Sequence, residues 1–159
     1  MIPVKVKELV CDLMMNPVVL LIDEDEEKAL PIWVGPFEAQ SISLALQGIC
    51  PERPLTHDLL MGICERLETR LIMVIISDVI DGNYLAELHL WRRNKEIVID
   101  ARPSDAIALA VRAQAPIYLS DKVAQDSLAI DDLLNEEQQQ EFRKILESGR
   151  SGATKKVVH

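Results

Sequence analysis

A chain of 159 residues is long enough to form one domain around a single hydrophobic core. Its hydrophobic fraction of 48% is ordinary for a globular protein, and no apolar run approaches the roughly 20 residues that a membrane helix needs. The net charge of −9 argues against a surface that coats nucleic acid in general, but it leaves room for an enzyme that touches only a few phosphates. Charged residues also interrupt the start of the chain, which is unlike a signal peptide. We therefore expect a cytoplasmic protein with no membrane partner.

The cysteines do not predict a metal site or a disulfide framework. Cys11, Cys50 and Cys64 are an odd number, far apart in the sequence, and no histidine lies near them at ligand spacing. We expect buried or idle thiols in a reducing compartment.

The first third of the chain reads as three strands followed by a helix. The partial alternation over 4–10 is typical of a strand near a sheet edge. The acidic stretch 23–28 separates two apolar runs and is read most simply as a solvated hairpin loop. Pro36 suits the first turn of a helix that Gly48 ends. The predicted strands of this part are 4–10, 18–22 and 29–34.

The middle of the chain alternates between helices and hairpin strands. Thr56 is expected to cap a helix that runs to Glu68, and Ser104 to cap another that runs to Ala113. A small helix is expected after Ser120 or Asp121. The helix over 56–68 carries leucines and an isoleucine at helical spacing, which predicts a core face made of Leu59, Leu60, Ile63 and Leu67. The predicted strands of this part are 71–76, 84–91, 96–99 and 116–119.

These elements predict an α+β fold. Strands come as hairpins joined by helices, so we expect a mainly antiparallel or mixed twisted sheet with three core helices packed on it and a C-terminal helix. We place the main domain at 1–132, the C-terminal helix at 133–148 and a disordered tail at 149–159.

The polar residues that could carry chemistry stand at the boundaries of these elements. Carboxylates with one imidazole suit Mg²⁺ or Mn²⁺, and arginines can hold a phosphate by bidentate contacts. Such a set would make a phosphodiester-cleaving site, in which a metal polarises the phosphoryl oxygen. The carboxylates and the histidine are Glu38, His57, Asp58, Asp100 and Asp105, and the arginines are Arg53, Arg102 and Arg112.

A structural interpretation of the same residues stands beside this one. Asp58 and Asp105 each lie in the first turn of a predicted helix, where the helix dipole favours an acid. Asp100 and Arg102 could form an ion pair at the end of the sheet. No GxSxG motif occurs, and the sequence nominates no partner for Ser41, so serine catalysis is not expected.

Three segments, in this order and spacing, resemble the bifunctional nuclease (BFN) domain family. They are Leu30-Pro31-Ile32-Trp33-Val34-Gly35-Pro36-Phe37-Glu38-Ala39, Arg53-Pro54-Leu55-Thr56-His57-Asp58-Leu59-Leu60, and the stretch from Asp100-Ala101-Arg102-Pro103-Ser104-Asp105 to Arg112. The likeness extends from about Met1 to Asp131. The polar positions that match the family motifs are Glu38, Arg53, His57, Asp58, Asp100, Arg102, Ser104 and Asp105.

The resemblance implies an α+β domain that forms dimers, and an activity on both DNA and RNA. Some members carry a further domain of the UvrB–UvrC type, which this sequence lacks, so a link to excision repair is not implied here. The resemblance does not settle the catalytic roles.

Our first hypothesis is therefore a metal-assisted nuclease that acts as a homo-oligomer, a dimer or larger. Glu38, Asp100 and Asp105 would hold Mg²⁺ or Mn²⁺, with His57 as general acid or base. The catalytic residues would be His57, Asp58, Asp100, Arg102 and Asp105, and the phosphate-binding residues Arg53 and Arg112. The alternative is a non-enzymatic, homo-oligomeric regulatory or ligand-binding module, and a third possibility is a hydrolase of small phosphoesters.

Overall fold

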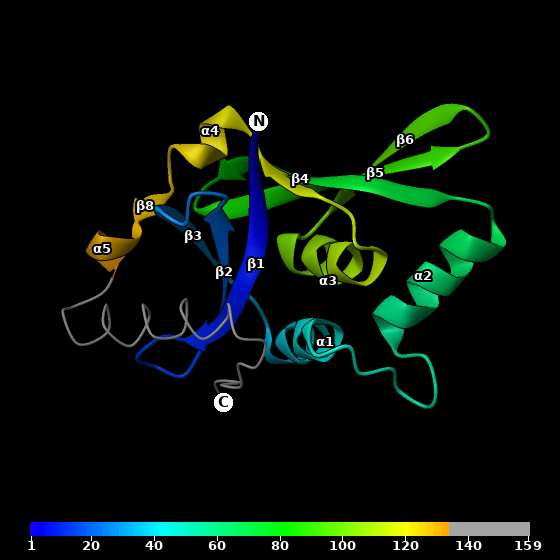
Figure 1. Cartoon of the computed structure of the whole chain (residues 1–159), viewed down its shortest axis with the longest axis horizontal. Coiled ribbons are helices and arrows are strands. Elements are labelled where there is room, and N and C mark those ends of the chain that lie inside the picture. The colour runs from blue at the N-terminus through cyan, green and yellow to red at the C-terminus, as the bar shows by residue number, and fades with distance from the viewer. Residues whose placement is uncertain (134–159) are drawn as a thin grey trace.

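The computed structural model describes residues 1–133, which form one eight-stranded mixed sheet with helices on one side (Figure 1). The sheet order is β6-β5-β4-β7-β1-β2-β3-β8. The strands are β1 (Ile2–Cys11), β2 (Pro17–Asp23), β3 (Lys28–Trp33), β4 (Arg70–Ile80), β5 (Asn83–Arg92), β6 (Lys95–Ala101), β7 (Ile117–Leu119) and β8 (Leu128–Ala129). The helices are α1 (Pro36–Leu46), α2 (Thr56–Arg66), α3 (Pro103–Ala113), α4 (Asp121–Ala124) and α5 (Ile130–Leu133).

Two antiparallel units make up the sheet, and the short strand β7 joins them. The strands β4, β5 and β6 form one meander, while β1, β2 and β3 form the other. Between them, β7 pairs antiparallel with β1 and parallel with β4. The predicted α+β fold with a mixed sheet is thus confirmed. The prediction that the first strand lies near an edge is wrong, because β1 is bonded on both sides.

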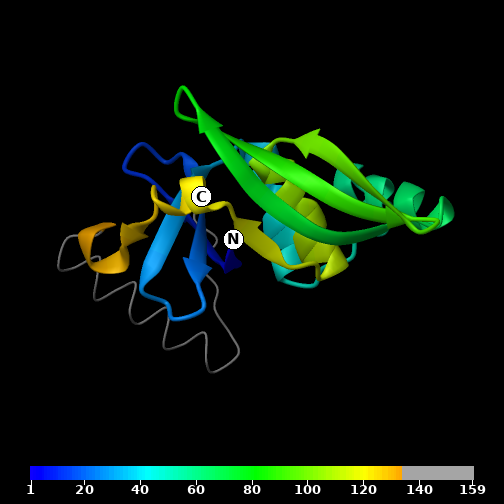
Figure 2. The same ribbon diagram turned by 90° about the horizontal axis from the view of Figure 1, so that it is seen from above.

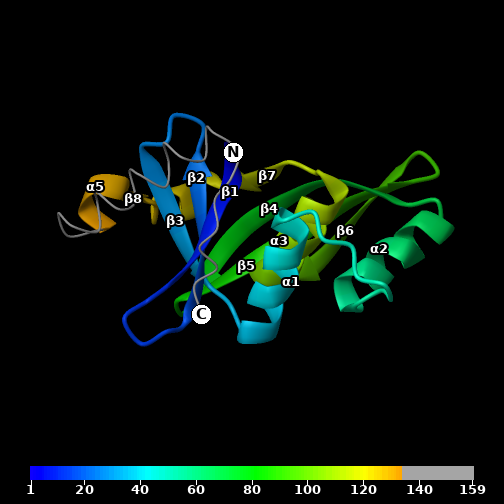
Figure 3. The ribbon, with the colours of Figure 1, turned by 60° about the horizontal axis from the view of Figure 1, so that its bottom comes forward.

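The helix α3 is the centre of the core. It packs on β4 and β5, and α1 and α2 pack against it in turn (Figure 3). Its run from Ala106 to Ala110 is buried, because alanines let the helix approach the sheet closely. The core of the described residues is aliphatic, with no buried aromatic side chain. Seen from above, the green strands β4, β5 and β6 lie over these helices (Figure 2).

The predicted core face of α2 is wrong. Its apolar residues are about half exposed, and the one buried side chain of this helix is that of His57. The helix packs on α3 through its other side, so its apolar stripe faces away from the core. The exposed residues of this stripe are Leu59, Leu60, Ile63 and Leu67.

Two of the predicted helix caps are also wrong. The residue before α2 is Leu55, whose backbone N–H donates to the Asp58 carboxylate at 3.0 Å, so Thr56 is the first helical residue. Ser104 lies inside the first turn of α3 and makes no cap bond, because Pro103 begins that helix. The cap of α4 is confirmed, since Ser120 Oγ accepts from the Val123 N–H at 3.2 Å.

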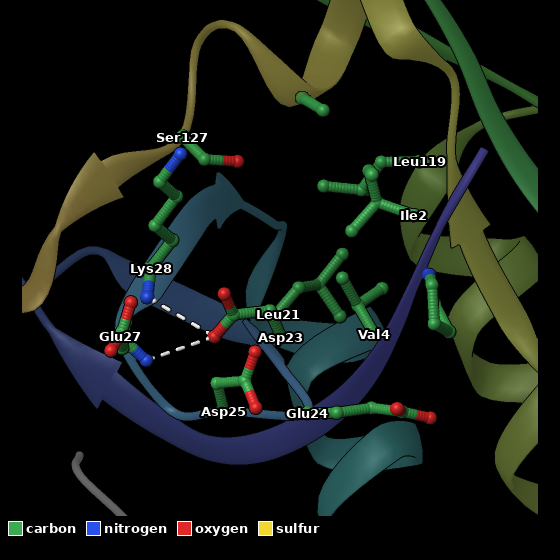
Figure 4. A pocket seen from close by; sticks show the side chains of 12 residues that line it. Ile2, Val4, Leu21, Asp23, Glu24, Asp25, Glu27, Lys28, Leu119 and Ser127 are labelled. Atoms are coloured by element: carbon green, nitrogen blue, oxygen red, sulfur yellow. Dashed lines mark hydrogen bonds between the residues drawn. The ribbon is translucent and has the colours of Figure 1, made fainter.

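The acidic loop between β2 and β3 is held by hydrogen bonds among its own residues. The Asp23 carboxylate accepts the backbone N–H groups of Glu27 and Lys28, at 2.9 and 3.1 Å (Figure 4). The loop borders a cavity of about 410 Å³ with an apolar wall of Ile2, Val4, Leu21 and Leu119. This agrees with its interpretation as a turn.

Other predictions stand as follows. Within residues 1–133 no helix is long and apolar enough to span a membrane. None of the three cysteines forms a disulfide, and Cys50 is exposed rather than buried. The predicted helix over 133–148 begins at the last described residue; the rest of it and the tail over 149–159 lie outside the described residues.

Candidate functional site

The three segments that carry the family resemblance meet where the helices begin. The first segment starts α1, the second starts α2, and the third connects β6 to α3. Since α1 and α2 both pack on α3, the polar residues of the three first turns come together. We call these hydrogen-bonded side chains the polar network. Its members are Glu38, Ser41, His57, Asp58, Arg102, Asp105 and Arg112.

The outer part of the polar network is an arginine held between two acids. Arg102 donates from Nε and Nη2 to the two carboxylate oxygens of Asp105, at 2.7 and 3.0 Å. Its Nη2 also lies 3.0 Å from Oε1 of Glu38. The Arg102 side chain is 64% exposed, whereas both acids are mostly buried. The guanidinium therefore faces solvent with its remaining group, Nη1.

Behind the arginine, His57 connects two helices. Its Nε2 is 2.9 Å from Oδ1 of Asp105, and its Nδ1 is 2.6 Å from Oγ of Ser41. Arg112 Nη2 donates to the same Oγ at 3.0 Å, so the serine keeps its own proton to donate to Nδ1. With a proton on Nε2, the imidazole then donates to Asp105 and accepts from Ser41. His57 is only 7% exposed, so it acts on its neighbours rather than on a molecule outside.

The innermost member, Arg112, uses all three of its nitrogens. Nε donates to Asp58 Oδ1 at 2.9 Å, Nη1 to the carbonyl of Ala108 at 2.9 Å, and Nη2 to both oxygens of Ser41. Its side chain is 10% exposed. A guanidinium so enclosed holds α1, α2 and α3 together.

These contacts shift the pKa values of the acids downward. Partial burial would raise the pKa of Asp105, but the hydrogen bonds from Arg102 and His57 outweigh it and hold the pKa below its usual range. The hydrogen bond from Arg112 lowers the pKa of Asp58. The bonds to Asp105 raise the pKa of Arg102. Both aspartates are therefore carboxylates at neutral pH.

Two of the predicted site residues are not brought into the polar network. Asp100 lies opposite Glu87 in the β5–β6 register, and its neighbours Ile99 and Ala101 lie opposite the buried Leu88 and Ala86. Asp100 is therefore on the sheet face that points away from the helices. Arg53 is exposed in the α1–α2 connection and has no contact with the network.

The predicted metal ligands do not form a cluster in the described part of the chain. Glu38 and Asp105 share Arg102 between them, while Asp100 lies on the other side of the sheet. Residues 1–133 contain no group of three His, Cys, Asp or Glu side chains placed to hold an ion. Only two of the three predicted ligands are near each other.

Ser41 and Gly35 are the members of the site that the sequence did not suggest. Ser41 is one helical turn after Glu38, so their spacing of three places both on one face of α1. Gly35 lies against the Glu38 carboxylate, because a Cβ added at Gly35 would come within 2.3 Å of Oε2. The 38/41 spacing was a usable signal for Ser41, whereas nothing local pointed to the contact at Gly35.

The inner residues of the polar network hold three helices together, and its outer end meets solvent. Every inner charge has a partner, so the network fixes where Arg102, Glu38 and Asp105 stand at the surface. An exposed guanidinium between two ordered carboxylates can bind an anionic oxygen and a water molecule side by side.

Comparison with known proteins places this site in a family. The model of the bifunctional nuclease domain matches residues 19–131, which include the whole polar network. An uncharacterized protein of Mycobacterium tuberculosis (strain ATCC 25618 / H37Rv) is 39% identical over 142 residues, covering 84% of this chain and 85% of that protein. Bifunctional nuclease 1 of Oryza sativa subsp. indica is 31% identical over 114 residues, covering 69% of this chain. Bifunctional nuclease 2 of Oryza sativa subsp. japonica is 30% identical over 110 residues, covering 67%. The matches to both rice proteins span 34% of their length. The chain belongs to the bifunctional nuclease domain family.

Proposed function

We propose that this protein is a nuclease that hydrolyses phosphodiester bonds of DNA and RNA at the outer end of the polar network. The observation that carries the proposal is Arg102, an exposed guanidinium held by two acids in a chain of this family. Rigid placement matters because hydrolysis of a phosphodiester is limited by positioning and by stabilisation of charge.

In this scheme Arg102 binds the phosphate, and Glu38 acts as the general base toward the attacking water. Nη1 of Arg102 is directed to a non-bridging oxygen of the scissile phosphate and steadies the charge that grows on it. Glu38 accepts a proton as water attacks phosphorus, and the bond from phosphorus to the leaving oxygen breaks as that oxygen takes a proton from solvent. His57 is a positioning residue in this scheme, because it is buried and holds Asp105.

A divalent cation, Mg²⁺ or Mn²⁺, remains part of the proposal only as an addition to this scheme. Glu38 and Asp105 are the two carboxylates near enough to bind one together, and it would supply further polarisation of the phosphoryl oxygen. Since Arg102 already bridges them, we derive no step through the metal. Cleavage measured with Mg²⁺, with Mn²⁺ and with EDTA tests this part separately.

The test is cleavage of labelled single-stranded and duplex DNA and RNA by two matched variants. Asp105→Asn keeps the shape of the side chain but loses its charge, and we expect at least a hundredfold loss of cleavage. Asp100→Asn removes the same charge on the opposite sheet face, and we expect wild-type cleavage. Circular dichroism and thermal melting confirm that both variants fold. A folded Asp105→Asn variant that cleaves at the wild-type rate contradicts the proposed site.

The apolar stripe of α2 favours the second candidate, a non-enzymatic homo-oligomeric module that regulates or binds a ligand. Four exposed apolar side chains on one helix are unusual on a monomer, and a second copy of this chain is the partner we propose for them. Ile63→Glu, at the centre of the stripe, should convert an oligomer to a monomer in light scattering after size exclusion. An oligomer that binds nucleotides but cleaves no polymer would favour the module over the nuclease.

A further inference from the structure

A group of cations stands at the end of the molecule farthest along α2 from the polar network. We call it the basic end; it lies where the end of α2 approaches the β5–β6 hairpin, elements that Figure 1 shows at the right. Within the described residues, no side chain of the basic end forms an ion pair with an acid. Its members are Arg66, Arg70, Arg92, Arg93 and Lys95.

The fold fixes these cations relative to one another. Arg92 lies directly opposite Lys95 in the β5–β6 register. Its Nε donates to the carbonyl of Leu67 at 2.9 Å, which ties the hairpin to the end of α2. On the adjoining strand, Arg70 lies opposite Trp91, whose ring is exposed. Side chains that face each other across two strands stand about 5 Å apart, so Arg92 and Lys95 lie close together on one face of the hairpin, while Arg70 lies on the other face.

The turn of the hairpin pushes one more cation outward. Arg93 and Asn94 have φ values of 48° and 62°, the pattern of a two-residue turn with both residues left-handed. Such turns favour Asn and Gly, and an arginine is an uncommon choice at the first position. The sequence thus accepts a disfavoured backbone conformation and gains an exposed charge at the tip.

Few acids offset the basic end, whereas several other cations among residues 1–133 form ion pairs. Glu65 and Glu68 lie near it along the chain, and Glu96 is bonded to His89 at 2.8 Å. Elsewhere, Lys5 binds Glu26 and Lys122 binds Asp78. Five cations with three acids near them leave a local excess of positive charge, which attracts a polyanion even when the whole chain is negative.

We propose that the basic end binds the sugar-phosphate backbone of the nucleic acid on which the nuclease acts. The inference rests on the proposed function, and it assigns the substrate a second contact away from the scissile bond. The helix α2 connects the basic end to His57 over 11 residues, or about 16 Å. That length corresponds to roughly five nucleotides along a duplex strand. The contact therefore holds a flanking stretch while Arg102 holds the scissile phosphate.

The experiment measures binding without cleavage. The full chain is titrated with a fluorescein-labelled 20-nucleotide phosphorothioate DNA, single-stranded and duplex, by anisotropy at several salt concentrations. Arg93→Glu/Lys95→Glu reverses two charges of the basic end. Lys5→Glu/Lys28→Glu makes the same change in net charge at the β2–β3 end of the sheet and is the matched control.

We expect the basic-end variant to bind at least tenfold more weakly at low salt, and the slope of log K against log salt to fall in magnitude by about two. The control should change affinity by less than threefold. Equal losses in the two variants, an unchanged affinity of the basic-end variant, or no binding by the wild type would each overturn the inference. Cleavage of ordinary DNA is scored apart: binding at the basic end without any cleavage defeats the proposed nuclease and leaves this inference standing.

Discussion

The charged side chains at the first turn of α2 are paired, whereas those at its last turn are not paired within the described part of the chain. At its first turn, the polar network holds two half-buried aspartates, a buried histidine and a largely enclosed arginine, each with a hydrogen-bond partner. At its last turn, the basic end exposes cations that bond to no acid among residues 1–133. Paired charges inside a protein specify a structure, and unpaired charges outside it act on other molecules. Substitutions in the two regions should therefore change different quantities.

The largest expected difference concerns stability. Arg112→Met leaves Asp58 and Ser41 without their buried partner and should lower the free energy of unfolding by about 3 kcal/mol. Arg93→Met, the same change at the basic end, should lower it by less than about 0.5 kcal/mol. Urea denaturation followed by circular dichroism measures both. Similar losses of unfolding free energy in the two variants would show that Arg112 does not hold the three helices together.

The pH dependence of stability should also separate the two regions. The pKa values of Asp58 and Asp105 are lower in the folded chain than their ordinary value of about 3.9. Their contribution to stability is therefore complete above about pH 5 and is lost as the pH falls through the folded pKa values. We expect the melting temperature to fall below about pH 4, and to fall less steeply in Asp105→Asn. An Arg93→Gln variant should follow the wild-type profile, and identical profiles for all three chains would contradict this account.

A smaller effect is expected where the polar network reaches the surface. In Gly35→Ala the new methyl group would collide with Oε2 of Glu38, which can move aside because it ends a side chain. Stability should change by less than about 1 kcal/mol, while cleavage should drop about tenfold because Glu38 leaves Arg102. Rates measured beside thermal melts decide this. Wild-type cleavage in Gly35→Ala would argue that the position of Glu38 is unimportant.

The smallest expected effect is that of one charge at the basic end. Arg93→Gln should leave folding and the cleavage rate at saturating substrate unchanged and should reduce the salt slope of binding by about one. Anisotropy titrations at several salt concentrations would detect it. A lower rate at saturation would place Arg93 in the chemistry rather than in binding.

The sequence predicted where the site lies, because each motif begins a helix and three helix starts can converge on one spot. The spacing of seven between Asp105 and Arg112 also placed both on one face of α3. The position of Asp100 was beyond reach for a physical reason. The strand β6 reads Ile97-Val98-Ile99, apolar on both faces, so alternation alone could not assign the side on which Asp100 falls. Its pairing with β5 settles this, since Ala86, Leu88 and Leu90 are the β5 residues that belong to the hydrophobic core shared with α3.

The predicted core face of α2 failed for a different reason. Its leucines have the spacing of buried residues, and a single sequence does not distinguish burial within one chain from burial between two. The buried His57 on the same helix gave no apolar signal at all, although it connects α1 to α3. Polar residues decided the orientation of this helix.

The aliphatic core has a consequence for optical measurements. Trp33 and Trp91 are both exposed, and Trp33 is fixed by a 3.0 Å bond from Nε1 to Asp12. Their fluorescence should already be that of indole in water, so unfolding of the chain will change it little. For the same reason the signal is sensitive to contact with a ligand: a molecule that covers Trp91 should change it, and the Trp91→Leu variant should not show that change. Tryptophan fluorescence can therefore report binding near Trp91, and folding of the chain changes this signal little.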